Sequence, residues 1–273
     1  MSARIWRFWC VNLGVALAAL LTLSPLLWML GMSFAETGQS SHAKLLFVPD
    51  PLVWDHYREL LRDEKIVRGF LNSLFLACAA TLLGCSFNVL AGYAFAKLHF
   101  KGRDRIFQTL LAALVIPGQI SMLPLFLILK SMGLVNSYAG VLVPSMVSIF
   151  GIFLVRQYAI SVPTAMLEAA RLDGAGEWQI FWRIVLPLLR PVLVTLALLT
   201  FLGSWNDFMW PLIVLNDSDR QTLPLAVANM AREHVQDTEL MMASSVLTVL
   251  PILLLFLFLQ KHYLRGLTLG AVK

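Results

Sequence analysis

The chain has 273 residues, of which 59% are apolar and 14% carry a formal charge, and its net charge is +5. Soluble domains are typically about half apolar and about a quarter charged, so this composition excludes a soluble globular domain and a disordered chain. Apolar runs of about 18 residues or more, which are typical of transmembrane helices, recur along the whole length. The three cysteines lie in or beside such runs, which is typical of packed side chains and not of disulfides or metal ligands. The sequence therefore predicts an all-α, polytopic membrane protein.

Six apolar segments are long enough to cross about 30 Å of hydrocarbon as helices. In chain order they are Leu13–Met32, Phe70–Ala96, Ile106–Leu129, Tyr138–Val155, Val192–Leu215 and Ala243–Leu259. The third contains Ile116-Pro117-Gly118-Gln119 and then Pro124. Because proline lacks an N–H donor and clashes with the preceding turn, we expect this helix to be interrupted at both places.

Small residues recur every four positions in the second segment. They are Ala80, Gly84, Asn88 and Gly92. Lipid supplies no hydrophobic drive for association between helices, so membrane helices pack through small residues that let two backbones come close. This pattern predicts a close helix–helix contact along one face of the second span.

The basic residues are unevenly placed along the chain. Thirteen lie in the segments on one side of the predicted spans and eight on the other, and five of those eight lie in the long first loop beside six acidic residues. Cytoplasmic loops carry an excess of Lys and Arg, so both termini are predicted to be cytoplasmic. The basic surplus is a topology signal, and no nucleic-acid partner is expected. Arg4 and Arg7 resemble the start of a signal peptide, but the apolar run exceeds about 7–15 residues, which predicts an uncleaved first helix.

The chain is expected to have three parts. Residues 1–69 hold the first helix and an outward loop, residues 70–260 hold the five other helices and a cytoplasmic segment, and residues 261–273 form a cytoplasmic tail. The outward loop carries large apolar residues at three- and four-residue spacing, which predicts a short helix lying on the membrane surface. They are Trp54, Tyr57, Leu60 and Leu61.

The segment 156–190 is too polar to span the membrane and too patterned for a linker. Pro163 suits the first turn of a helix, Thr164–Asp173 are mostly good helix formers, and Gly174-Ala175-Gly176 is typical of a helix end. A second short helix is expected over Glu177–Leu186, ending at the proline that follows. The segment is therefore predicted to be a cytoplasmic helix–turn–helix.

The same segment carries a spaced motif: Glu168-Ala169-Ala170, three residues, Gly174, nine residues, Ile184, one residue, Leu186-Pro187. It resembles, at every spaced position, the EAA loop of permease subunits of bacterial binding-protein-dependent ABC importers. The resemblance implies a type I importer permease in the bacterial cytoplasmic membrane, whose coupling helix seats in a groove of a separate ATPase subunit. It implies further roles for seven residues. Glu168, Ala169, Ala170 and Gly174 would dock on the ATPase, and Ile184, Leu186 and Pro187 would fix the second helix against the bundle.

Other stretches resemble the carbohydrate permeases of this superfamily. They are Ile116-Pro117 with Pro124-Leu125, residues 133–140, residues 205–212 and residues 222–225, together with a tail at 265–273 that is similar to that of the smaller maltose-type permease subunit. The resemblance implies a carbohydrate cargo moved by alternating access. It also implies four kinds of partner: a second homologous permease, two copies of an ABC ATPase that bind the ATP and magnesium, an extracytoplasmic solute-binding protein, and membrane lipid.

The sequence contains no catalytic or metal-binding motif. No lysine follows a glycine, so a Walker A phosphate loop is lacking, and HExxH, paired cysteines and G-x-S-x-G are also missing. We therefore expect a transport subunit without an ATPase site, a cofactor or a metal of its own. An integral-membrane transferase or a channel-forming oligomer is a weaker alternative.

Four residues are candidates for the translocation pathway because aromatic faces, amides and a carboxylate can bind hydroxyl groups. They are Gln119, Trp205, Asn206 and Asp207. Asp207 is the one acidic residue inside a predicted span, where an unpaired carboxylate is costly. Asn206 and Asp207 would equally well cap a broken helix ahead of Pro211. A neutral sugar is the expected cargo, with a glycerol-phosphate-type anion or another polar solute as the alternative.

Overall fold

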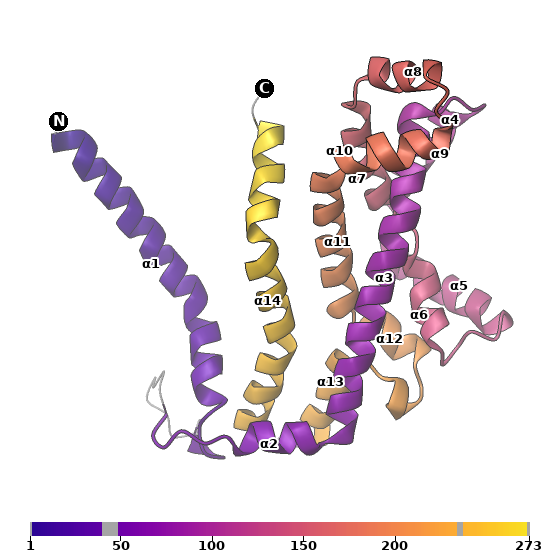
Figure 1. Cartoon of the computed structure of the whole chain (residues 1–273). Coiled ribbons are helices and arrows are strands. Elements are labelled where there is room, and N and C mark those ends of the chain that lie inside the picture. Colours follow the sequence, from indigo (N-terminus) through magenta and orange to yellow (C-terminus); the bar gives the residue numbers. More distant parts are fainter. Residues whose placement is uncertain (1, 40–48, 234–236, 272–273) are drawn as a thin grey trace. The chain divides into compact units, whose positions relative to one another are not determined.

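The computed structural model describes residues 2–39, 49–233 and 237–271, and within these ranges the regular structure is entirely helical (Figure 1). The helices are α1 (Ser2–Met32), α2 (Asp55–Arg62), α3 (Glu64–Lys97), α4 (Arg103–Ala113), α5 (Gly118–Ser131), α6 (Tyr138–Ser145), α7 (Ile149–Ile160), α8 (Thr164–Leu172), α9 (Glu177–Ile180), the π-helical turn η2 (Phe181–Val185), α10 (Leu186–Leu188), α11 (Arg190–Trp205), α12 (Met209–Val214), the 3-10 turn η3 (Ser218–Arg220), α13 (Leu223–Glu233) and α14 (Thr238–Ala271). The chain forms two compact units, Met1–Val67 with Ala226–Pro251, and Arg68–Leu225 with Ile252–Lys273.

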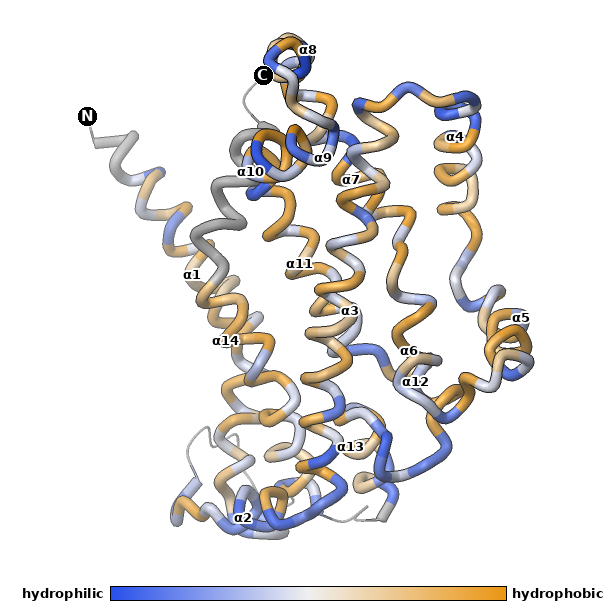
Figure 2. The backbone as a smooth tube through the Cα atoms, turned by 45° about the vertical axis from the view of Figure 1, so that its right-hand side comes forward, coloured by the Kyte–Doolittle hydropathy of each residue, from blue (hydrophilic) through white to orange (hydrophobic). Residues whose placement is uncertain are grey.

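The apolar helices can provide up to six membrane spans. Within the described residues, three helices are long and apolar enough to span alone, and hydrophobic residues line them in Figure 2. They are Trp6–Met32, Glu64–Lys97 and Thr238–Phe258. Three bent pairs, α4 with α5, α6 with α7, and Glu177–Leu188 with α11, qualify if each pair counts as one span. The all-α class and the six predicted spans are consistent with this arrangement.

The interruption predicted at Pro117 is confirmed, whereas the one predicted at Pro124 is wrong. Helix α4 ends at Ala113, α5 begins at Gly118 directly after Pro117, and the two axes are bent by 106°. Pro124 lies inside α5, which continues to Ser131. A proline removes a single N–H donor, and a membrane helix tolerates that loss when its other hydrogen bonds persist.

The sequence did not predict the break in the fourth span. Helices α6 and α7 are bent by 40° around a short gap that ends at Ser148. The Ser148 N–H donates to Oδ1 of Asn88 on α3 at 2.9 Å, and the Ser148 hydroxyl accepts from Gly151 N at 3.2 Å. A buried side chain of another helix thus supplies the acceptor that the broken helix lacks.

Helix α3 packs closely on α7 at Asn88 and Gly92, the last two positions of the predicted stripe of small residues. A Cβ placed on Gly92 would lie 2.6 Å from Cβ and Cγ1 of Val155, closer than side chains can approach. Asn88 is only 1% exposed, and its amide donates to the Gly84 carbonyl at 2.6 Å. The close contact predicted from the four-residue spacing is confirmed.

The close contact at Gly92 predicts that any side chain at this position lowers the stability of the protein. Gly92→Ala should destabilise the protein by about 1–3 kcal/mol, because overpacking forces neighbouring atoms apart, and the melting temperature of the purified protein should fall. Gly84→Ala is the matched control, since the nearest atom to its Cβ would be Cγ2 of Thr200 at 3.3 Å, a side-chain end that can move slightly. Equal melting temperatures for the two variants would contradict the tight contact between α3 and α7.

The short helix predicted in the first loop is α2, and one face of it is buried within the protein. Leu60 is buried, whereas Trp54 and Leu61 are 60% and 68% exposed. His56, four residues before Leu60, completes the buried face, and its Nε2 lies 2.9 Å from the Ala35 carbonyl oxygen. A polar contact with the chain that precedes the loop therefore sets the orientation of α2.

Candidate functional site

Helix α8, the first helix of the segment 156–190, ends in a glycine-dependent motif. Gly174 has φ +84°, its N–H donates to the Arg171 carbonyl at 3.0 Å, and the Ala175 N–H donates to the Ala170 carbonyl at 2.9 Å. These two bonds form a Schellman motif, which satisfies carbonyls at the helix end and requires a left-handed residue. The predicted end of the helix at Gly174 is confirmed. Pro163 lies one position earlier than predicted, as the extended residue that precedes the first turn.

The second helix is longer and less regular than predicted. It continues through Pro187 to Leu188, and Phe181–Val185 form a π turn in which the Leu186 N–H donates to the Phe181 carbonyl. The prediction that this helix ends at Pro187 is wrong. A π turn is wider than an α turn, so it relieves the crowding that a proline ring causes against the preceding turn.

The inner face of this second helix packs into one hydrophobic cluster with α3, α7 and α11. Its buried residues include Ile180, Phe181 and Val185, and α8 adds Leu167, which is 1% exposed. The motif residues Ile184 and Leu186 are partly buried against the same cluster. The sequence motif includes Ile184 and Leu186 but none of the three buried residues, which are apolar and lie in the predicted helix.

Polar contacts tie the segment to the end of α3. The Arg171 guanidinium donates to Glu177 Oε1 at 2.7 Å, and the Tyr93 hydroxyl donates to Glu177 Oε2 at 3.1 Å. The hydrogen bond from Arg171 holds the pKa of the Glu177 carboxyl below its usual value. Lys97 Nζ donates to the Val162 carbonyl at 2.6 Å, just before α8 begins. Since the Arg171–Glu177 ion pair is exposed to solvent, it orients the segment more than it stabilises it.

Three of the four predicted docking residues lie on the outer side of this anchored segment, and Ala170 packs partly against the cluster. Glu168, Ala169 and Gly174 are exposed and Ala170 is partly so, whereas Pro187 is partly buried. Leu172 beside them is 89% exposed. The sequence motif therefore divides into an outer face on α8 and an inner face on the second helix.

A cavity of about 560 Å³ lies between α3, α5, α6, α7, α11 and α12. Two of the four predicted pathway residues line it, Gln119 and Asp207. Asn206 is exposed but is not part of the lining, and Trp205 is fully buried. The Trp205 ring packs against Phe70 at 5.6 Å and stacks on Phe201 at 5.9 Å between ring centroids. The structure therefore places Trp205 in the core and not on the cavity wall.

Asp207 connects the two helices that form the predicted fifth span. Helix α11 ends at Trp205, α12 begins at Met209, and Oδ1 of Asp207 accepts a hydrogen bond from the Trp210 N–H at 3.3 Å. Asp207 therefore makes the capping contact foreseen for it, whereas the Asn206 amide donates to the Leu202 carbonyl of α11 at 2.9 Å. The carboxyl group also lies on the cavity wall, so capping and exposure to the cavity coexist in one side chain.

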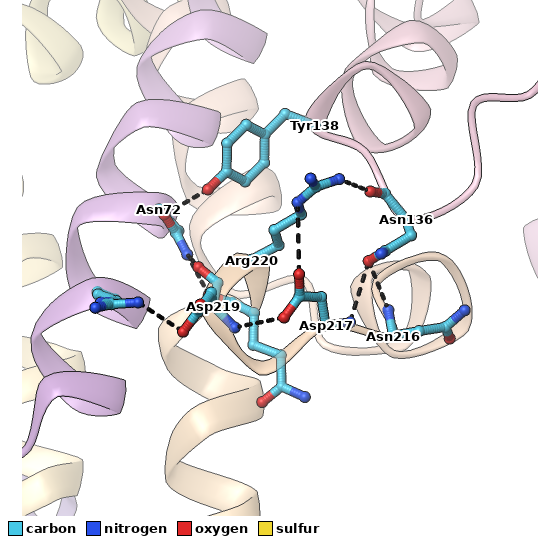
Figure 3. A network of polar contacts seen from close by, with 9 residues as sticks. Asn72, Asn136, Tyr138, Asn216, Asp217, Asp219 and Arg220 are labelled. Carbon is cyan, nitrogen blue, oxygen red and sulfur yellow. Dashed lines mark hydrogen bonds and ion pairs between the residues drawn. The ribbon is translucent and has the colours of Figure 1, made fainter.

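The chain between α12 and α13 is held by a network of polar contacts, shown in Figure 3. Asn136, with φ +59°, accepts at Oδ1 from the N–H groups of Asn216 and Asp217 at 3.1 Å each, and Arg220 donates to its carbonyl. Asp219 pairs with Arg68 of α3 at 2.7 Å, and its carbonyl accepts from Asn72 at 2.9 Å. The network fixes residues 215–221 to α3 and to the turn between α5 and α6.

Comparison with known proteins decides the family. The family described as binding-protein-dependent transport system inner membrane component matches residues 88–268, which include the segment 156–190 and the cavity helices α5–α12. The chain belongs to this family. The arabinooligosaccharides transport system permease protein AraQ of Halalkalibacterium halodurans is 37% identical to it, over 97% of this chain and 96% of the relative.

Other members differ in the solute that their names give. The lactose transport system permease protein LacG of Rhizobium radiobacter is 32% identical over 95% of this chain and 94% of the relative. The sn-glycerol-3-phosphate transport system permease protein UgpE of Yersinia pestis is 29% identical over 94% of each chain. A crystal structure of a bacterial ABC transporter involved in alginate import contains a chain with the same fold, with a TM-score of 0.84, 24% identity and coverage of 96% and 98%. The fold is that of a type I importer permease.

Proposed function

We propose that this family member is the permease subunit of an ATP-driven importer that moves a carbohydrate across the bacterial cytoplasmic membrane. The observation that carries the proposal is the cytoplasmic segment: an exposed helix, α8, closed by Gly174 and anchored to the helix bundle through Phe181. Relatives at 37% and 32% identity are permeases for arabinooligosaccharides and lactose by name. Both points favour transport of a sugar over an enzymatic role.

The proposed partners are two ABC ATPase subunits, a second homologous permease and an extracytoplasmic solute-binding protein. The ATPase subunits would bind the ATP and magnesium, since this sequence has no phosphate-binding loop. Glu168, Ala169, Ala170 and Gly174 would contact one ATPase subunit. On the opposite side of the membrane, the ordered residues 215–221 would give the solute-binding protein a fixed surface.

The contacts of the segment suggest how movement reaches the membrane. ATP-driven closure of the ATPase dimer would displace α8. That displacement would pass to α3 through Tyr93, which touches Glu177 and lies 5.3 Å from the Phe181 ring, and through Lys97, which holds the Val162 carbonyl. Because α3 also packs tightly on α7 at Gly92, these helices would move together. The cavity would then open alternately to the two sides, as alternating access requires.

Reconstitution tests the proposal. The chain would be co-expressed with candidate permease, ATPase and binding-protein partners and placed in proteoliposomes. We expect binding protein loaded with an oligosaccharide to raise ATP hydrolysis and to drive sugar uptake. If sn-glycerol 3-phosphate is imported and sugars are not, the cargo assignment is wrong and the coupling role stands. If the chain never associates with an ATPase subunit, the importer assignment itself fails.

A further inference from the structure

The cavity wall has a single charge. Among the described residues that line it, Asp207 alone carries an ionisable side chain, and no Lys, Arg or His is part of the lining. The remaining lining is apolar or carries hydroxyl and amide groups. A solute in this space therefore meets one carboxylate and no compensating cation from this chain.

The neutral polar groups of the wall are available to a solute. Within the described part of the chain, the side chains of Gln119, Thr200 and Ser204 line the cavity and form no hydrogen bond with protein groups. Phe150, which is 47% exposed, adds an aromatic face to the same wall. Binding sites for small polar molecules combine an apolar surface with a few polar groups that fix orientation. This wall suits a ring that has an apolar face and hydroxyl groups at its edge.

The Asp207 carboxylate is fixed in place at this wall. Its Oδ1 accepts from the Trp210 N–H at 3.3 Å, and the residue stands at the junction of α11 and α12, so the group cannot swing away without uncapping α12. A charge surrounded by low-dielectric walls acts on solutes more strongly than it would in water. An anionic solute in the cavity is repelled, whereas a hydroxyl group can donate a hydrogen bond to the carboxylate.

We propose that Asp207 is a specificity determinant that makes the cavity favour uncharged carbohydrate and oppose anionic solutes such as uronates and sugar phosphates. This inference rests on the proposed transport function, because it treats the cavity as part of the pathway. It assigns a chemical class to the cargo from this chain's own residues. The glycerol-phosphate-type alternative is disfavoured by the same carboxylate.

Charged thiol reagents test the electrostatic step without any knowledge of the cargo. Cys10, Cys78 and Cys85 are replaced by alanine, and Ser204→Cys places a thiol on the cavity wall one helical turn before Asp207. The purified full-length chain is then treated with methanethiosulfonates of similar size bearing a sulfonate, a neutral group or a trimethylammonium. We expect Asp207→Asn to raise the ratio of sulfonate to trimethylammonium reaction rates roughly three- to ten-fold at low ionic strength. Asparagine retains the acceptor that caps α12, so the fold should persist.

Two controls separate a local charge from other effects. Asp207→Glu keeps the charge and should keep the original ratio. Asp173→Asn removes a charge at the end of α8, outside the cavity lining, and should leave the ratio unchanged. An unchanged ratio in Asp207→Asn would overturn the inference even if the chain proves to be an importer. Conversely, the expected ratios would stand even if reconstitution showed no coupling to an ATPase.

Discussion

Gly174→Leu is expected to abolish uptake while the protein remains in the membrane. Residue 174 has φ +84°, a conformation that costs a residue with a Cβ about 1 kcal/mol or more. A Cβ there would meet no atom within 4 Å, so the fold has room for the side chain and the damage falls on the backbone at the end of α8 and on the outer face. We expect weaker co-purification of the ATPase subunit and loss of sugar transport in proteoliposomes, with normal amounts of the variant in the membrane.

Gly176→Leu is the matched control for this prediction. Gly176 also has open space around its Cβ position, but its φ of −72° suits any residue. The Gly176→Leu variant should therefore retain most of the transport activity. Gly174→Asn should retain part of it, because asparagine tolerates the left-handed conformation. If Gly176→Leu is as inactive as Gly174→Leu, bulk at the surface and not the backbone of residue 174 is responsible. If Gly174→Leu transports at the normal rate, the coupling role of α8 is wrong.

Phe181→Ala is expected to uncouple ATP hydrolysis from transport. Phe181 is 4% exposed and packs against Tyr93 of α3 with 5.3 Å between ring centroids. Removal of a buried phenylalanine ring costs about 3–5 kcal/mol, and here the loss falls on the contact that ties the segment to α3. A segment held less firmly still reaches the ATPase but moves without moving α3. The measurement is the number of ATP molecules hydrolysed per sugar imported, which should rise.

The neighbouring tryptophan provides the control for Phe181. Trp182 is 58% exposed, so Trp182→Ala removes a larger ring from a position with less burial and should have a smaller effect on this ratio. Phe181→Leu keeps most of the buried volume and should lie between the wild type and Phe181→Ala. An unchanged ratio in Phe181→Ala, with full uptake, would show that force reaches the membrane by another route.

Features that depend on local chemistry were predictable from the sequence. Hydropathy alone indicates the long helices, Pro117 indicates the break before α5, and Gly174 indicates the end of α8, because each effect is set by one or a few adjacent residues. The small-residue spacing likewise predicted the contact at Gly92. The EAA motif was recognised from the spacing of its residues alone, and three of them, Glu168, Ala169 and Gly174, are exposed in the structure.

Features that depend on residues far apart in sequence were not predictable. The break between α6 and α7 involves Asn88, sixty residues away along the chain from Ser148. Trp205 was predicted to be a pathway residue because an aromatic face can bind hydroxyl groups, but its ring packs against Phe70 and Phe201 in the folded chain. Gln119 and Asp207 could be predicted as pathway residues from their side-chain chemistry. Thr200 and Ser204 could not, because the cavity wall combines side chains from six helices and only the fold brings them together.

The π turn at Phe181–Val185 links the number of residues in the EAA motif to the direction in which its side chains face. A π turn contains one residue more than the α turn it replaces, and one residue rotates a helix by about 100°. The π turn overlaps the end of the nine-residue spacing between Gly174 and Ile184, and its extra residue changes the direction in which the residues after the turn face relative to those before it. Deletion of any one of the five residues of the π turn would change the composition of the segment very little. We expect such a deletion to turn Ile180 away from the cluster that buries Val185, so a change in the length of this segment should disrupt its packing.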